Sequence, residues 1–91
     1  MGYSKHDFER LAKNMDAQSC RLFLLMFGKS DSNGMVSKDV SLNSLHIETN
    51  IAISTLSKTT KKLKEAGIVA VEYEVGVRTK YKLLPPEQWK I

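Results

Sequence analysis

Residues 53–69 read ISTLSKTTKKLKEAGIV, and this stretch decides the fold. At 100° per residue, its few large apolar residues share one helical face with two threonines: Leu56, Thr59, Thr60 and Leu63. The opposite face is basic and rich in hydroxyl groups, and it consists of Ser54, Thr55, Lys58, Lys61 and Lys62. No acidic residue follows until Glu65, so the lysines lack the i,i+4 partners of an ordinary solvated helix. The stretch is therefore either a solvated helix that happens to be basic or a surface that contacts something anionic.

The pattern changes from helical to alternating after Gly67, a residue that can take a positive φ and end a helix. The alternating positions are Val69, Val71, Tyr73 and Val75, followed by Thr79, Tyr81 and Leu83. They predict two antiparallel strands joined by a turn at residues 75–77. We interpret Tyr73 and Tyr81 as a cross-strand pair.

Two amphipathic helices are predicted before this region. The first, SKHDFERLAKNM, has Ser4 and Asp7 placed as an N-terminal cap, and the second, DAQSCRLFLLMFG, begins near Asp16 and ends at Gly28. Residues 22–27 are all apolar and point all round the second helix, so most of its sides need a cover. We therefore predict a homodimer in which a second copy supplies part of that cover. The residues assigned to this dimer interface are Leu22, Phe23 and Met26.

The segment between these regions is less regular. Residues 29–34 form a predicted loop, residues 35–36 a short extended piece, and Val40, Leu42 and Leu45 the apolar side of a short helix. Asn50 then marks a polar break, because asparagine tolerates the left-handed conformation. The predicted order is helix, helix, short strand, helix, helix, hairpin.

Composition limits the functional classes. The chain has 91 residues, 42% of them apolar, a net charge of +4 and a pI near 9.3, which favours one domain with an anionic partner such as nucleic acid. The single Cys20 cannot form an internal disulfide, which favours the cytoplasm, and no apolar run approaches the ~20 residues of a membrane span. No metal-ligand set, phosphate loop or catalytic motif is present, so we expect no metal, no cofactor and no enzymatic activity.

Residues 53–69, together with EVGVRTKYKL at residues 74–83, resemble the second helix and the wing of the ArsR/MarR-like winged-helix regulators. The match includes the Ser-Thr-Leu-Ser-Lys start and the Glu-Ala-Gly ending, and it extends over roughly residues 42–84. Two departures are Ala52, where the family usually has a capping Ser or Thr, and Thr60, where it has a large apolar residue. Asn50 or Ser54 is the alternative cap.

This resemblance implies an α+β fold, a winged helix-turn-helix with two N-terminal helices and a C-terminal β-hairpin wing. Residues 1–91 would form a single domain, with lead-in and dimerisation helices in 1–28, the helix-turn-helix in 37–67 and the wing in 68–84. A narrower resemblance lies in FERLAKNMDAQSCRLFLLMF at residues 8–27. It is similar to the lead-in helices of the TubR proteins, winged-helix dimers that bind plasmid centromeres and link them to a tubulin-like GTPase.

The resemblance also implies a role for each basic residue. Ser54, Thr55 and Lys58 would face base edges in the major groove of double-stranded DNA, with Ser57 on the same helix. Lys61 and Lys62 would lie near phosphates. Arg78 and Lys80 would come from the wing, with Arg78 in an A·T-rich minor groove.

Two alternatives to a TubR-like centromere-binding adaptor that represses its own operon stay open. The first is an ordinary ArsR/MarR-like repressor of plasmid, phage or chromosomal origin. The second is a winged helix used only for contact with an acidic protein. A steep fall of duplex binding with salt, at unchanged fold, would separate DNA binding from protein contact.

Overall fold

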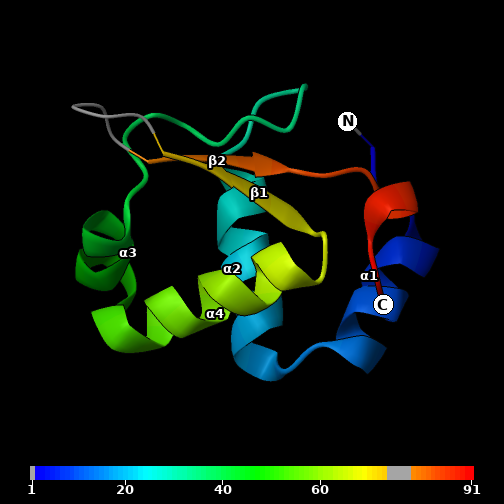
Figure 1. Cartoon of the computed structure of the whole chain (residues 1–91), viewed down its shortest axis with the longest axis horizontal. Helices are drawn as coiled ribbons and strands as arrows, with labels where there is room; N and C mark the ends of the chain where they lie inside the picture. Colours follow the sequence, from blue (N-terminus) through cyan, green and yellow to red (C-terminus); the bar gives the residue numbers. More distant parts are fainter. Residues whose placement is uncertain (1, 74–78) are drawn as a thin grey trace.

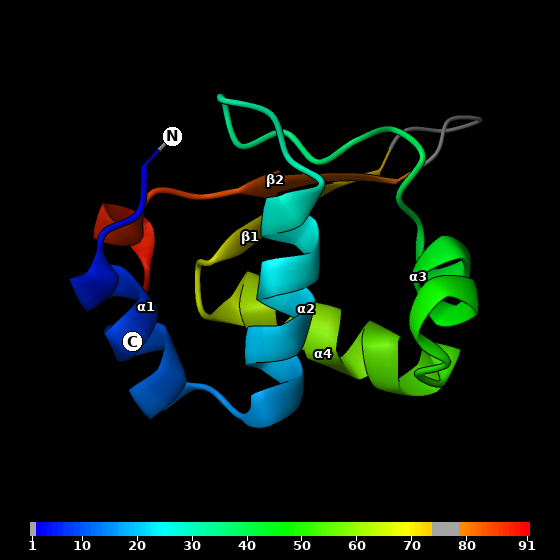
Figure 2. The ribbon, with the colours of Figure 1, turned by 180° about the vertical axis from the view of Figure 1, so that it is seen from behind.

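The computed structural model describes residues 2–73 and 79–91, and its fold is α+β as expected. Within these ranges there are four α-helices, one two-stranded antiparallel sheet and a short 3-10 helix. In chain order they are α1 (Lys5–Asn14), α2 (Ala17–Gly28), α3 (Leu42–Thr49), α4 (Ile53–Glu65), β1 (Val69–Glu72), β2 (Lys80–Leu83) and η1 (Pro86–Gln88). In Figures 1 and 2 the sheet lies along one side, α2 and α4 cross beneath it, and α1 and α3 lie at opposite ends.

The first two helices begin at the predicted caps. At α1, the Ser4 hydroxyl accepts a hydrogen bond from the Asp7 amide at 3.2 Å, and the Asp7 carboxylate accepts one from the Ser4 amide at 2.7 Å. At α2, the Asp16 carboxylate accepts from the Ser19 amide at 2.8 Å. Each side chain satisfies a backbone donor that the first helical turn leaves without an internal partner.

The connection between α3 and α4 is a tight turn through residues 50–52. Asn50 has φ 61°, as expected from its tolerance of the left-handed conformation. His46 supports the turn, because its Nδ1 lies 2.7 Å from the carbonyl oxygen of Ile51. The N-cap of α4 is Ala52, and no side chain caps this end. The proposed caps Asn50 and Ser54 are therefore both wrong.

The sheet pairs Val69 with Leu83 and Val71 with Tyr81. Tyr81 lies directly opposite Val71 in this register, so Tyr73 and Tyr81 form a diagonal rather than a directly opposed cross-strand pair, and both line the same groove. The predicted extended piece at residues 35–36 lies along the other edge of β2, where Met35 forms an isolated bridge with Lys82. This segment gives β2 backbone partners on both sides.

The core of the single chain already contains the side chains that we assigned to a dimer interface. Leu22, Phe23 and Met26 are 1%, 0% and 0% exposed, so they cannot contact a second copy without unfolding, and that assignment is corrected. The apolar run does point all round α2, but α1, α4 and the C-terminal segment cover most of its sides. The large apolar side chains that α2 leaves exposed are Leu24 and Phe27.

The C-terminal segment is fastened to α1 by one arginine. The Arg10 guanidinium donates hydrogen bonds to three backbone carbonyl oxygens, those of Pro86 at 3.1 Å, Trp89 at 3.0 Å and Ile91 at 2.9 Å. It also lies 5.7 Å from the centre of the Trp89 ring. A planar group with donors on several edges is suited to holding three carbonyls at once.

The same segment passes close to the end of α4. Gly67, which follows this helix, has φ 72°, and a Cβ atom added there would lie 2.6 Å from the carbonyl oxygen of Gln88. The Lys90 amide donates to the Ala66 carbonyl at 2.7 Å. Glycine is therefore needed at position 67 for two reasons, its backbone conformation and the close approach of another segment.

Candidate nucleic-acid interface

The inner face of α4 consists of the predicted residues, and all four are buried: Leu56, Thr59, Thr60 and Leu63. The Thr59 hydroxyl donates to the Thr55 carbonyl at 2.7 Å, and the Thr60 hydroxyl donates to the Leu56 carbonyl at 2.8 Å. Both buried hydroxyl groups are thus satisfied within the helix, which avoids the penalty of an unpaired polar group. This explains how half of the buried face can be threonine.

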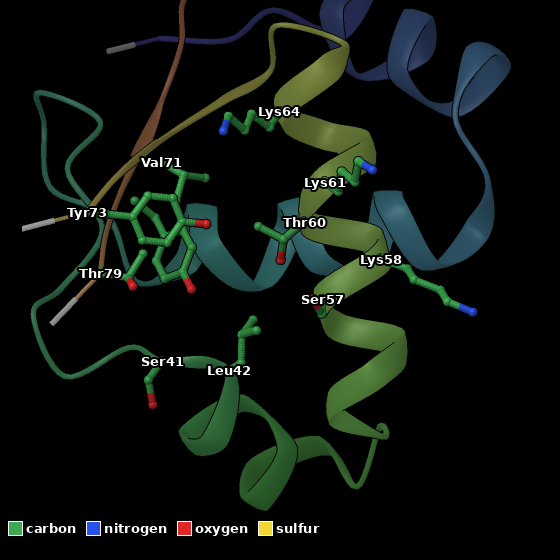
Figure 3. A pocket seen from close by; sticks show the side chains of 11 residues that line it. Ser41, Leu42, Ser57, Lys58, Thr60, Lys61, Lys64, Val71, Tyr73 and Thr79 are labelled. Atoms are coloured by element: carbon green, nitrogen blue, oxygen red, sulfur yellow. The ribbon is translucent and has the colours of Figure 1, made fainter.

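The outer face of α4 carries the residues that the sequence pattern singled out for DNA contact. Ser54, Ser57, Lys58, Lys61 and Lys62 are exposed, and Thr55 is half-buried. Figure 3 shows Lys58 and Lys61 extending from α4 away from the hairpin strands. Among the described residues, neither of these two lysines has an ion-pair partner. The structure therefore brings two uncompensated ammonium groups onto one hydroxyl-rich surface.

Lys62 differs from its neighbours, because its Nζ lies 2.7 Å from Asp16 Oδ2. The hydrogen bond from Lys62, with those from Ser19, holds the pKa of Asp16 down to about 2. Both side chains are about half exposed, so the pair is screened and worth ~0.2–1 kcal/mol. The expectation that the α4 lysines lack acidic partners is wrong for Lys62. Its partner is 46 residues away in sequence and is brought there by the contact between α2 and α4.

A groove of about 560 Å³ separates α4 from the strands and from the start of α3 (Figure 3). Its lining residues are Ser41, Leu42, Ser57, Lys58, Thr60, Lys61, Lys64, Val71, Tyr73, Thr79 and Tyr81. Lys64 points into it, with its Nζ 5.9 Å from the centre of the exposed Tyr73 ring. Burial raises the pKa of Tyr81 above its usual value, so this hydroxyl stays protonated and can donate.

The part of the site assigned to the hairpin is only partly described. Arg78 lies outside the described residues, so its role in the minor groove stays a prediction. Lys80 is the first residue of β2, where it lies opposite Glu72 and is half-buried. Its neighbours Thr79 and Tyr81 line the groove beside α4, whereas Lys80 lines a separate pocket together with residues of the segment 29–38. The structure therefore does not bring Lys80 to the groove, and its contact with DNA stays a prediction.

One exposed residue of this surface was not singled out by the sequence pattern. Ile53, the first residue of α4, is 44% exposed and is not part of the core. Positions i, i+4 and i+8 of a helix lie along one side, which puts Ile53 in a row with Ser57 and Lys61. The helical wheel could have revealed it, because residue 53 falls outside the sector of the buried positions.

No group of three or more His, Cys, Asp and Glu side chains suitable for a metal ion occurs among residues 2–73 and 79–91. None of the helices in these ranges has the length and apolar character to cross a membrane. No protein-family model, curated protein or solved structure matches the chain. The residues of the site present hydroxyl and ammonium groups, which are able to donate hydrogen bonds to anionic acceptors.

Proposed function

We propose that this protein binds double-stranded DNA as a winged helix-turn-helix. In this arrangement α3 and α4 are the two helices of the motif, and β1 and β2 form the wing. The observation that carries the proposal is the outer face of α4, where Lys58 and Lys61 project from a surface of hydroxyl groups without acidic partners among the described residues. This is the chemistry that duplex DNA requires, with phosphates for the ammonium groups and base edges for the hydroxyls.

In the proposed complex, α4 enters the major groove with its N-terminal end deepest. Ser54, Thr55 and Lys58 then reach base edges, where hydroxyl groups are permissive and lysine favours guanine. Lys61 contributes mainly to phosphate binding, which adds affinity and salt dependence without sequence information. Lys64 and the groove beside it lie toward the wing, where the sugar–phosphate strand would pass.

The proposal extends to a homodimer, because one small module buries little surface and two-fold symmetric proteins bind paired half-sites. The surface for the second copy must be other than the buried residues of α2, and Leu24 and Phe27 are apolar and exposed. Sedimentation at micromolar concentration, with and without DNA, tests this state. A monomer under both conditions would contradict it.

The biological role that we propose is the TubR-like one: a cytoplasmic protein that binds repeated centromere sites, represses its own operon and contacts a tubulin-like GTPase. Its support is the resemblance of residues 8–27 to the lead-in helices of the TubR proteins, and the two helices that precede α3 in the structure. A gene for a tubulin-like GTPase beside this one would favour that role over an ordinary ArsR/MarR-like repressor. Its absence, with a bound site only at the protein's own promoter, would favour the repressor.

Binding to a labelled duplex, measured by fluorescence anisotropy from 50 to 300 mM salt, tests the central claim. We expect a steep fall with salt, and Lys58→Ala and Lys61→Ala should each weaken binding. The matched control is Lys13→Ala on α1, where the exposed Lys13 already pairs with Glu9 at 2.6 Å. Equal binding by all three variants, or no duplex binding by the wild type, would instead favour a surface that contacts an acidic protein.

A further inference from the structure

The side of α4 that carries Ile53 changes its chemistry along the helix. Ile53, Ser57 and Lys61 follow one another at i, i+4 and i+8, and all three are exposed. The order is thus an apolar group at the N-terminal end, then a hydroxyl group, then an ammonium group. Figure 3 shows the third member, Lys61, pointing outward from the helix.

The fold of the single chain does not explain the apolar member. Ile51, two residues earlier, packs against the core, whereas Ile53 is 44% exposed and is not among the buried core residues. A polar residue at position 53 would hydrate the exposed part of this surface better. An exposed isoleucine beside Ser54 and Ser57 is instead suited to a partner with an apolar group at that point.

The major groove of DNA offers partners for these groups in the same order, from its floor to its rim. Its floor presents base edges, including the C5-methyl group of thymine, and its rim is lined by phosphates. A helix that enters N-terminus first places its first residue nearest the floor and its later residues nearer the rim. Resting on the DNA-binding function proposed above, we infer that Ile53 determines specificity by contacting the methyl group of a thymine.

The experiment removes that methyl group from the DNA and the side chain from the protein. Duplexes bound by the wild type are first selected from a random library. Each thymine of the selected site is then replaced singly by deoxyuridine, which lacks only the methyl group. Binding is compared for wild type, Ile53→Ala and the matched control Ile47→Ala, which removes an isoleucine on α3 that is 75% exposed.

We expect one or two thymines at which deoxyuridine weakens wild-type binding about fourfold, the effect of one methyl group leaving an apolar contact. Ile47→Ala should show the same loss at the same positions. Ile53→Ala should bind the thymine duplex more weakly than wild type and lose nothing further with deoxyuridine. Circular dichroism should show unchanged folding, because alanine is a good helix former at an exposed position.

The outcomes separate this inference from the function on which it rests. The inference fails, while DNA binding stands, in two cases in which the wild type does select duplexes. In the first, deoxyuridine weakens wild type and Ile53→Ala equally at every position. In the second, deoxyuridine has no effect at any position. The inference about Ile53 also fails if the selected site has no thymine in the part of the major groove that α4 contacts. If the wild type selects and binds no duplex, the DNA-binding function itself fails.

Discussion

Replacing Asp16 by asparagine should increase affinity for DNA, although the residue lies on α2 and is not expected to contact DNA. Its carboxylate now holds Lys62 at 2.7 Å and neutralises that part of α4. Asparagine caps a helix about as well as aspartate, so the hydrogen bond from the Ser19 amide to Asp16 should have an equivalent in the variant. The substitution therefore removes one negative charge and frees one lysine with little change in local structure.

The expected size follows from the exposure of the pair. Because the two side chains are 58% and 47% exposed, their interaction is worth ~0.2–1 kcal/mol, and the variant should lose no more than this in stability. When Lys62 binds a phosphate in the wild type, it must give up that interaction. Removing the competition should strengthen DNA binding about 1.4- to fivefold at low salt. A freed lysine should also steepen the slope of log affinity against log salt by ~0.9 per site.

The assay is a salt titration of duplex binding by wild type, Asp16→Asn, Lys62→Ala and Lys61→Ala, with urea unfolding measured in parallel. Lys61→Ala should make the slope shallower by ~0.9, and Lys62→Ala by clearly less, because the charge of Lys62 is already compensated. An Asp16→Asn slope equal to that of wild type, at equal stability, would refute the reasoning. It would mean that Lys62 does not reach DNA even when released.

Three further predictions concern the stability of the fold. Gly67→Ala should lower the free energy of unfolding by ~2–4 kcal/mol in urea denaturation, because alanine would be strained at the positive φ and its Cβ would clash with the Gln88 carbonyl. The control is Gly28→Ala, which should be neutral or stabilising because the space around its Cβ position is open. Arg10→Leu should cost ~2–4 kcal/mol by leaving three carbonyls without their donor, and Arg10→Lys should recover only part of it. Because the pKa of Asp16 is lowered by folding, its carboxylate stabilises the protein above about pH 4, and this stabilisation is lost as the pH falls toward 2. The loss should be at most ~1 kcal/mol, because the ion pair is screened by solvent. Asp16→Asn should abolish it when unfolding is measured from pH 6 to 2.

The features predicted correctly from sequence are those set by short-range physics. The cap formed by Ser4 and Asp7, the left-handed turn at Asn50 and the helix end at Gly67 each depend on residues within a few positions. The two faces of α4 follow from its periodicity alone, and every position predicted to be buried is buried. The residues assigned to the outer face are exposed or half-buried for the same reason.

The errors come from contacts between distant segments. No local pattern shows that Asp16 approaches Lys62 or that the C-terminal segment returns to Arg10, since these partners lie 46 or more residues apart. An apolar run such as that of α2 indicates that its side chains must be buried, but it does not indicate whether the same chain or a second copy buries them. In this structure the same chain buries most of them. The position of Tyr81 opposite Val71 is fixed by the strand register, which alternation alone leaves undetermined.

The division of α4 into two faces has a consequence for how this protein can evolve. The helix is held in place by Leu56, Thr59, Thr60 and Leu63, and the two buried hydroxyls donate their hydrogen bonds to carbonyl groups of the helix's own backbone. Folding therefore makes little demand on the exposed positions 53, 54, 57, 58 and 61. A lineage can change what α4 contacts by substitutions there while the scaffold stays the same, and a laboratory library randomised at those positions should yield mostly folded proteins with new binding preferences.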